Sequence, residues 1–439
     1  MILSAIILMP SAGSGLPSYL FGPVAGLPLL TRQILGLRRA GVSQVAILLD
    51  SDQRGGLAQE LDRHRPRVGE LGILSCWPEP SAPDAPDRRD AYVLLLPVNT
   101  LPSRRVYAAL TDNLPPPGRL SLGVISQSGS FPTTSAAMLT SPPGWPTAGL
   151  MLFSAAAWQD WLAWCKQNET EGCRAVAAGQ APLGAFVAHK VALGHVVPVT
   201  LEQAELISVS CDEDRTAATE RLIALENGPP LSEGILEKAW NRRLARLILP
   251  WVLARPISPN QITIFSFLVG LLAVWGFAQG SYAASVGAGL LLPLILVLDC
   301  LDGAVARLKY QESPLGALLD IHGDSVLNLL LFLGIVIGCY RNSGQPLFWV
   351  LGILIIVGYV ACWQLLRPQP LCQPAIPPPA AGSESLGDKL LAEAVSRDFF
   401  YIILVMALVQ RLDWLVSALA VGTNIFAWLT YRRQKDGQN

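Results

Sequence analysis

Residues 298–324 read LDCLDGAVARLKYQESPLGALLDIHGD, and on both sides of them the chain is apolar enough to lie in a membrane. Four residues of this stretch are aspartates, namely Asp299, Asp302, Asp320 and Asp324. A carboxylate inside a membrane span is costly, and an ionisable residue there marks a functional site by default. The stretch therefore predicts a membrane domain and the place where its chemistry occurs.

The composition of the whole chain is that of a membrane protein. Of its 439 residues, 51% are hydrophobic and 15% are charged. The mean hydropathy of +0.40 is higher than that of ordinary soluble proteins. A formal charge of −1 provides no basic face, which argues against a nucleic-acid partner. None of the eight cysteines forms a CxxC pair, so we expect reduced cytosolic thiols rather than a zinc site or a disulfide framework.

The first half of the chain has the pattern of a soluble α/β domain. Short apolar runs alternate with a helical segment at 27–41, and this βαβ pattern predicts a parallel sheet covered by helices. We expect a Rossmann-like domain over 1–232. Its first residues lack a charged n-region, which favours a buried strand over a signal peptide. The predicted strands are 4–9, 45–50, 92–98 and 149–154.

The second half predicts an all-α membrane domain over 257–435. An amphipathic helix over 233–256 precedes it and is expected to lie at the membrane surface, with its arginines near the lipid headgroups. A span needs roughly 17 to 25 apolar residues. Six candidates are found, the fifth of them short: 262–280, 284–307, 317–339, 346–366, 399–412 and 414–431.

The distribution of positive charge predicts how this domain is oriented. With the N-terminus inside, most Lys and Arg residues near the span ends lie on the cytoplasmic side, and only Arg341 and Arg411 face outward. We therefore expect a multi-pass protein of the cell (inner) membrane. Both termini and the aspartates are then cytoplasmic.

The spacing of the aspartates predicts a metal site. Asp299 and Asp302 are three residues apart, and Asp320 and Asp324 are four apart, so each pair lies on one helix face. Because the link between the two helices is short, we expect the helices to be antiparallel neighbours whose acidic faces can meet. Clustered carboxylates repel one another, and Mg²⁺ or Mn²⁺ ions bound together with substrate phosphates relieve that repulsion. Two such ions would clamp a phosphoryl group.

The alternative is that these aspartates cap helix ends or pair with nearby arginines. Too few cations lie close in the sequence to neutralise four carboxylates. Two glycines and an arginine are also interleaved with them. Gly303 and Gly316 remove side chains where the helices approach each other or a ligand, and Arg307 offers a permanently charged, planar donor for phosphate. We therefore favour the metal site.

The full pattern D-x-x-D-G-x-x-A-R-x8-G-x-x-x-D-x-x-x-D resembles the signature of the CDP-alcohol phosphotransferase family at every fixed position, and the resemblance covers residues 235–435. It implies transfer of a phosphatidyl or phosphopolyol group from a CDP-alcohol to a hydroxyl of a polyol or polyol phosphate, with release of CMP. Such an enzyme serves phospholipid or polyol-phosphodiester biosynthesis. Because members of this family are usually dimers, the resemblance also implies a homodimer.

The resemblance also implies roles for individual residues. The first metal ion would be held by Asp299, Asp302 and Asp320, and the second by Asp320 and Asp324. Asp324 would be the general base that removes the acceptor proton. The residues implied to accommodate the cytidine and a phosphate are Gly303, Ala306, Arg307 and Gly316.

Three further residues have two readings each. Asn260 and Thr263 follow a family pattern, Pro-Asn-x-x-Thr, and would line the nucleotide pocket, or else they only end one helix and start the next. Arg397 would bind the phosphate of the acceptor, or else it only anchors a span on the cytoplasmic side.

The first half resembles a sugar-nucleotide type nucleotidyltransferase domain, through AIIL, the turn SAGSG and VAGLPLLTRQILGLRRAGVSQVAIL. Its fusion to the membrane domain is similar to inositol-1-phosphate cytidylyltransferase joined to di-myo-inositol phosphate phosphate synthase. The departures indicate an inactive domain, because Lys and Arg are absent before Arg32 and Asn99 stands where a metal-binding aspartate is expected. Asp212 or Asp214 would supply one carboxylate at most.

Two other functions remain open at this point. A bifunctional enzyme would also make its own CDP-alcohol with the first domain. A cation-coupled transporter would use the aspartates for ion binding, but such proteins place carboxylates near the bilayer midplane, whereas these four lie near the cytoplasmic ends of their spans.

Overall fold

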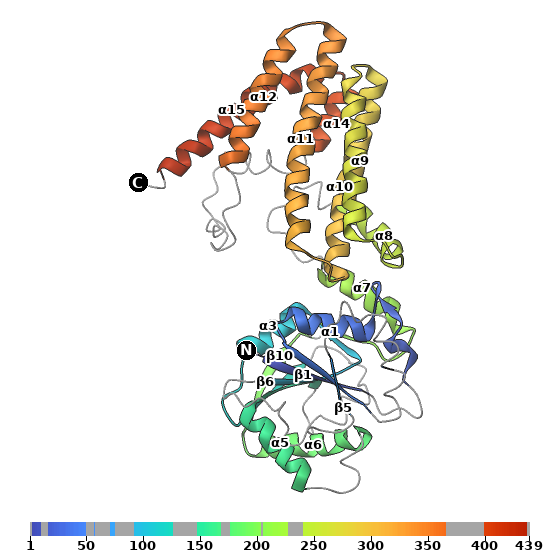
Figure 1. Ribbon diagram of the computed structural model, residues 1–439, viewed down its shortest axis with the longest axis vertical. Coiled ribbons are helices and arrows are strands. Elements are labelled where there is room, and N and C mark those ends of the chain that lie inside the picture. The colour runs from blue at the N-terminus through green and yellow to red at the C-terminus, as the bar shows by residue number, and fades with distance from the viewer. Residues whose placement is uncertain are drawn as a thin grey trace. The chain divides into compact units, whose positions relative to one another are not determined.

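The computed structural model describes residues 2–9, 16–49, 57, 71–74, 92–125, 147–167, 176–202, 205–226, 240–365 and 399–436. The chain divides into two compact units, Met1–Glu226 and Asn227–Asn439. Figure 1 shows the first as a sheet with helices and the second as a helical bundle.

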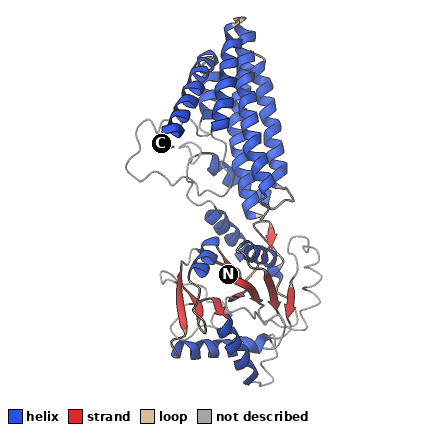
Figure 2. Cartoon of the chain, turned by 60° about the vertical axis from the view of Figure 1, so that its left-hand side comes forward, coloured by secondary structure: helices blue, strands red, loops and turns tan. Residues whose placement is uncertain are grey.

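A seven-stranded sheet forms the centre of the first unit, with the order β10-β8-β9-β6-β1-β4-β5. β1 lies parallel to both of its neighbours, so that Ile6 is opposite Ala46 on one side and Leu95 on the other. The strands are red in Figure 2. Their bounds are β1 Ile2–Leu8, β4 Gln44–Leu48, β5 Gly72–Leu74, β6 Tyr92–Pro97, β8 Leu120–Ile125, β9 Thr147–Ser154 and β10 Val196–Leu201.

One strand runs against the predicted direction. β9 pairs antiparallel with both β6 and β8, so the sheet is mixed and the expectation of an all-parallel sheet is wrong at this strand. A nearly continuous apolar run is typical of a strand that is covered on both faces, and β9 contains such a run, AGLMLF. It does not specify which way the strand points.

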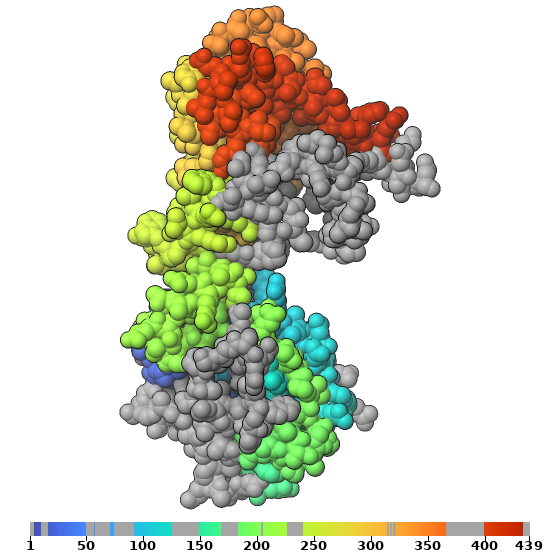
Figure 3. Space-filling model, turned by 180° about the vertical axis from the view of Figure 1, so that it is seen from behind, coloured from blue at the N-terminus to red at the C-terminus, as the bar shows by residue number. Residues whose placement is uncertain are grey.

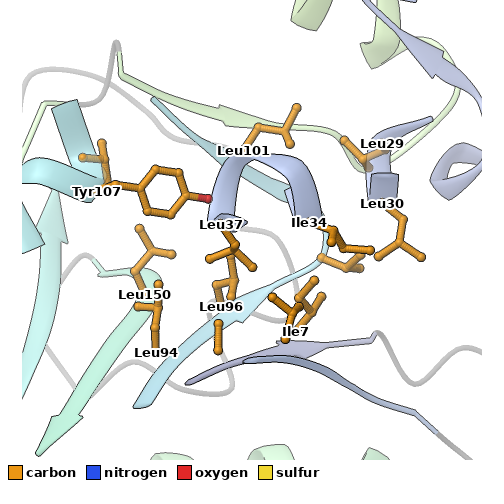
Figure 4. Close-up of a cluster of buried hydrophobic side chains, with 14 of the residues drawn as sticks. Ile7, Leu29, Leu30, Ile34, Leu37, Leu94, Leu96, Leu101, Tyr107 and Leu150 are labelled. Atoms are coloured by element: carbon orange, nitrogen blue, oxygen red, sulfur yellow. The ribbon is translucent and has the colours of Figure 1, made fainter. Parts of the chain in front are cut away.

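Helices cover both faces of the sheet, as the βαβ pattern predicts. Alternate residues of β1 supply the two cores, with Ala5 and Ile7 on one side and Ile6 and Leu8 on the other. The first core packs under the helices α1 (Leu29–Arg39) and α3 (Arg104–Asp112), and Figure 4 shows Leu29, Leu30, Ile34 and Leu37 of α1 above Ile7 and Leu96. The second contains the aromatic residues of α5 (Ala155–Gln167) and α6 (Val176–Ala192), among them Trp158, Trp161 and Phe186.

Small elements complete the first unit on the side of α1. β7 (Thr100–Pro102) pairs antiparallel with β11 (Leu206–Ser208), and β2 (Pro23–Val24) pairs with β3 (Leu27–Pro28). A 3-10 turn, η1 (Ser18–Leu20), precedes β2, and α7 (Asp214–Glu226) ends the unit.

The second unit is helical throughout its described part. Five helices are long and apolar enough to cross a membrane, as judged from length and composition, and they account for five of the six predicted spans. The span predicted at 399–412 is the short helix α14, of which ten residues are described. The helices are α8 Arg242–Leu253, α9 Pro259–Ala278, α10 Tyr282–Leu308, α11 Pro314–Ser343, α12 Leu347–Leu365, α14 Phe399–Leu408 and α15 Leu412–Asp436.

Within this bundle α9 is the helix against which both α10 and α11 pack. Close approach of α9 and α11 depends on two glycines of α11: a Cβ at Gly334 would lie 2.7 Å from the carbonyl oxygen of Val274, and one at Gly338 would lie 2.1 Å from that of Phe277. α12 and α15 pack on each other and leave large apolar side chains exposed, such as Trp349, Trp414 and Trp428, as expected of lipid-facing helices. Figure 3 shows α14 and α15, in red, on one face of the bundle.

Candidate active site

α10 carries the first two aspartates on its last two turns. The helix begins after Ser281, whose hydroxyl accepts a hydrogen bond from the Ala284 amide at 3.4 Å. It then runs through an apolar stretch to Asp299 and Asp302. Asp302 is buried, with 7% of its surface exposed, while Asp299 is half-buried.

α9 supplies a partner for the buried carboxylate. Ser258 and Gln261 form a capping box with Pro259 in the first turn, which fixes where α9 starts. The cap brings Thr263 into position to donate its hydroxyl hydrogen to Asp302 Oδ2 at 2.6 Å. Thr263 is therefore not only a helix-start residue: it holds one carboxylate oxygen of Asp302 in place.

α11 carries the second pair of aspartates. Ser313 caps the helix by accepting a hydrogen bond from the Gly316 amide at 2.9 Å, and Pro314 occupies the first turn. Asp320 and Asp324 follow on this helix one turn apart. Asp324 is half-buried, and the side chain of Asp320 lies outside the described atoms.

The two glycines of the motif, Gly303 and Gly316, have different neighbours. A Cβ at Gly316 would lie 2.9 Å from Ser313 Oγ and 4.0 Å from Oδ1 of Asn260, which places Gly316 beside the exposed Asn260 at the start of α9. A Cβ at Gly303 would meet only Arg307, whose Nη1 would be 3.3 Å away. The Arg307 side chain thus folds back along its own helix over Gly303, towards the turn of Asp299.

Arg307 is the cation of the motif, and one of its hydrogen-bond donors lacks an acceptor among the described residues. Its Nε is buried and has no hydrogen-bond partner among the described residues. A buried N–H without an acceptor is unfavourable. An anionic ligand with an oxygen beside this nitrogen would accept its hydrogen bond. Ala306 precedes it on α10 and is half-buried.

Two residues that sequence reasoning missed support the site from its edges. Lys309, 5% exposed, donates from Nζ to the carbonyl oxygens of Arg255 and Ile257 at 2.8 and 2.9 Å, and so ties the end of α10 to the link between α8 and α9. The Tyr359 hydroxyl of α12 donates to the Ser325 carbonyl at 2.9 Å, next to Asp324. Neither role leaves a local signal, because each depends on a contact between helices.

The structure brings Thr263 of α9 against Asp302 of α10, folds Arg307 over Gly303, and places Gly316 beside Asn260. α10 and α11 make little direct contact within the described residues, because both pack on α9. Among the described side chains no three His, Cys, Asp or Glu residues form a metal-binding group, and Asp320 is outside that set. Arg397 also lies outside the described residues.

The two aspartates considered for the first unit, Asp212 and Asp214, are engaged in structural contacts. Asp212 accepts a hydrogen bond from Ser18 at 2.8 Å and pairs with Arg215 at 3.2 Å. Asp214 accepts from the amides of Ser210 and Cys211, and the hydrogen bond from Ser210 holds the pKa of this carboxyl below its ordinary value. Asn99, two residues after the end of β6, is buried, and its Oδ1 has no hydrogen-bond partner among the described residues. The turn SAGSG lies outside the described residues.

A comparison with protein families identifies the second unit. Residues 256–428 match the family model described as CDP-alcohol phosphatidyltransferase. The C-terminal region is a CDP-alcohol phosphatidyltransferase domain. The match contains all four aspartates of the motif together with Asn260 and Thr263.

Curated relatives that match this part of the chain include bifunctional IPC transferase and DIPP synthases and archaetidylinositol phosphate synthases. The bifunctional IPC transferase and DIPP synthase of Archaeoglobus fulgidus is 29% identical over 38% of this chain and 32% of its own length. The archaetidylinositol phosphate synthase of Pyrococcus horikoshii is 28% identical over 36% of this chain and 79% of its own length. For the bifunctional relatives of Thermococcus kodakarensis, Archaeoglobus fulgidus and Aquifex aeolicus, the matched segment spans 28 to 32% of their length.

Among solved structures, the inositol-1-phosphate CTP transferase from T. maritima aligns with 52% of this chain and 98% of its own chain, at 14% identity and a TM-score of 0.34.

Members of the CDP-alcohol phosphatidyltransferase family generally use divalent metal ions. The aspartate carboxylates of the motif suit such an ion, because carboxylate oxygens are the ligands that hard divalent cations prefer. The hydrogen bond from Thr263 to Oδ2 of Asp302 is the kind of outer contact that orients a ligating carboxylate.

Proposed function

We propose that this protein is an integral membrane CDP-alcohol phosphotransferase. It moves a phosphatidyl or phosphopolyol group from a CDP-alcohol to a hydroxyl of a polyol or polyol phosphate and releases CMP. The observation that carries the proposal is the complete aspartate motif on α10 and α11, within a domain of the matching family. The relatives that act on inositol compounds favour an inositol phosphate as the acceptor.

Each residue of the motif then has a task. Asp299, Asp302, Asp320 and Asp324 hold two divalent cations, Mg²⁺ or Mn²⁺, which when bound neutralise charge on the phosphoryl oxygens. Asp302 is held for this task by Thr263. Asp324 accepts the proton of the acceptor hydroxyl as its oxygen attacks the phosphorus.

The remaining residues bind the donor. Arg307 donates to a phosphate of the CDP-alcohol, and its orphan Nε provides a hydrogen for that purpose. Gly303, Ala306 and Gly316 leave room for the cytidine, with Asn260 at the rim of the pocket. Arg397 binds a phosphate of the acceptor.

The chain lies in the cell (inner) membrane as a homodimer, with both termini and the active site on the cytoplasmic side. Its first unit acts as a scaffold and does not catalyse nucleotidyl transfer. Asn99 in place of an aspartate and the absence of Lys and Arg before Arg32 support this assignment.

The test is release of CMP by the purified protein with Mg²⁺ or Mn²⁺. CDP-diacylglycerol and CDP-inositol serve as donors, and a panel of polyols and polyol phosphates serves as acceptors. We expect Asp324→Asn to abolish turnover, because an amide does not accept the proton, while the thermal unfolding midpoint stays unchanged.

The matched control is Asp413→Asn. Asp413 stands in the first turn of α15, outside the aspartate motif of α10 and α11. It should retain full turnover. Absence of CMP release from the wild-type protein with every donor and acceptor pair would refute the proposed function.

A further inference from the structure

Helix α12 carries no residue of the aspartate motif, yet it contacts α11 at the turn of Asp324. The hydroxyl of Tyr359, in the second half of α12, donates a hydrogen bond to the carbonyl oxygen of Ser325 at 2.9 Å. Ser325 directly follows Asp324, and the two partners of this bond are 34 positions apart in the chain. The catalytic scheme proposed above assigns no task to Tyr359.

Aromatic packing fixes the orientation of this tyrosine. Its ring meets that of Phe332 of α11 edge-on, with the ring centroids 6.0 Å apart and 76° between the ring planes. Phe332 in turn meets Phe399 of α14 at 5.8 Å and 82°. Aromatic pairs prefer this edge-to-face geometry. Ser325 and Phe332 lie seven positions apart, about two helical turns, and therefore share one face of α11 that Tyr359 contacts at both places.

Helix α9 holds the same turn of α11 from another side. A Cβ at Gly270 of α9 would lie 2.5 Å from Cδ1 of Leu327, so the buried Leu327 side chain packs closely on this glycine. An apolar contact of this kind limits the distance between the helices but has no preferred direction. A hydrogen bond weakens steeply away from its preferred angle. The bond from Tyr359 therefore also fixes how α11 is rotated at this turn.

The Ser325 carbonyl accepts this bond in addition to its place in the helix. A carbonyl oxygen has two lone pairs, and the helical hydrogen bond to the amide four residues later needs only one of them. The bond from Tyr359 thus ties the backbone of this turn to α12. The Asp324 carboxylate projects from the residue next to the tied carbonyl, so a rotation of the turn would move it.

We infer that Tyr359 is a positioning residue for Asp324, and that its hydrogen bond to the Ser325 carbonyl keeps the Asp324 carboxylate aimed at the acceptor hydroxyl. The inference rests on the proposed function, in which Asp324 accepts the proton of that hydroxyl. Proton transfer needs the two oxygens to lie within about 2.6 to 3.2 Å of each other, so a small rotation of α11 would slow it. Tyr359 itself contacts no reacting atom in this role.

The first experiment is Tyr359→Phe, which removes the hydroxyl and keeps the ring against Phe332. We expect kcat for CMP release to fall about fivefold to tenfold, as for the loss of one hydrogen bond of ordinary strength. KM for the CDP donor and for the acceptor should be unchanged, since neither substrate contacts Tyr359. The solvent isotope effect on kcat in deuterium oxide should increase, because proton transfer limits the rate more strongly once the base is misplaced.

Tyr340→Phe is the matched control. It makes the same change on the same two helices, at the end of α11 away from Asp324, where the centroids of the Tyr340 and Trp349 rings are 5.1 Å apart. It should leave kcat and the isotope effect unchanged. A lower kcat in Tyr359→Phe with an unchanged isotope effect would mean that the hydroxyl only stabilises the fold, and would overturn the inference.

A second measurement needs no turnover. Amide hydrogen exchange of the full chain in detergent reports local opening of a helix. The segment 322–330 should exchange faster in Tyr359→Phe than in the wild type, and Tyr340→Phe should not change its exchange. Equal exchange of this segment in all three proteins would show that the bond does not tie the Asp324 turn to α12, which also overturns the inference.

Failure of this inference and failure of the proposed function are distinguishable. CMP release by the wild type, with the same kcat and isotope effect in Tyr359→Phe, upholds the enzyme and refutes the positioning role. Absence of CMP release from the wild type with every substrate pair refutes the enzyme, and the positioning role with it.

Discussion

The 2.6 Å hydrogen bond from Thr263 to Asp302 joins residues 39 positions apart and fixes one oxygen of a buried carboxylate. A carboxylate that is buried and oriented in this way loses little further freedom when it binds a cation, so the contact matters for metal affinity more than for the fold.

We predict that Thr263→Val, which keeps the shape of the side chain and removes its hydroxyl, weakens metal binding. The Mg²⁺ concentration for half-maximal CMP release should rise by about tenfold, the size expected when such an outer contact is lost. Thr263→Ser retains the donor and should behave as the wild type. An unchanged Mg²⁺ requirement in Thr263→Val would show that this hydrogen bond does not position the carboxylate.

At the scale of elements, the position of α11 depends on how closely it approaches α9. Gly334 and Gly338 form a G-x-x-x-G pair on the face of α11 that meets the carbonyl oxygens of Val274 and Phe277. Small residues at this spacing let membrane helices pack backbone to backbone. Asp324 lies nearer the start of the same helix, so this contact also determines where the proposed base stands.

We therefore predict that Gly338→Ala separates the two helices. The new Cβ would begin 2.1 Å from the Phe277 carbonyl oxygen, which the backbone has to relieve by moving. The cost should be about 1 to 3 kcal/mol in the free energy of unfolding, as for overpacked cores. Activity should fall as well. Both are measured by unfolding and CMP release in detergent.

Gly287→Ala is the control for that prediction, since a Cβ at Gly287 of α10 meets nothing within 4 Å. Alanine favours a helix over glycine, so this variant should be as stable as the wild type or slightly more so. If Gly338→Ala were equally harmless, the close packing of α9 and α11 described above would be incorrect.

At the scale of the whole molecule, the two units have separate cores. Both faces of the sheet in the first unit are covered by residues of that unit, and the core of the bundle is formed by helices of the second. A domain with its own complete core is expected to fold by itself.

We predict that residues 1–226, produced alone, unfold cooperatively on heating but release no pyrophosphate from CTP with Mg²⁺ and a polyol phosphate. The physical reason is the lack of charge: Asn99, two residues after the end of β6, is neutral, and Asp214 is occupied by the amides of Ser210 and Cys211. Pyrophosphate release from this fragment, at a rate that depends on Mg²⁺, would establish the bifunctional enzyme instead.

Much of this protein follows from its sequence, because local patterns carry the information. The length of each apolar run determines that a helix can span a membrane, and Ser258, Ser281 and Ser313 mark where α9, α10 and α11 start. The three- and four-residue offsets place each pair of aspartates on one helix face. The alternation of apolar runs with helices in the first half predicts the α/β unit for the same reason.

Tertiary structure alone decides which of these faces meet. Three contacts join segments that are distant in the chain: the pairing of β9, the hydrogen bond of Thr263 to Asp302 and the attachment of Lys309 to the carbonyl of Arg255. Periodicity tells which side of a helix is apolar, but not which helix covers it. That choice depends on the combined packing of all the helices, and here it made α9 the element that both aspartate-bearing helices pack against.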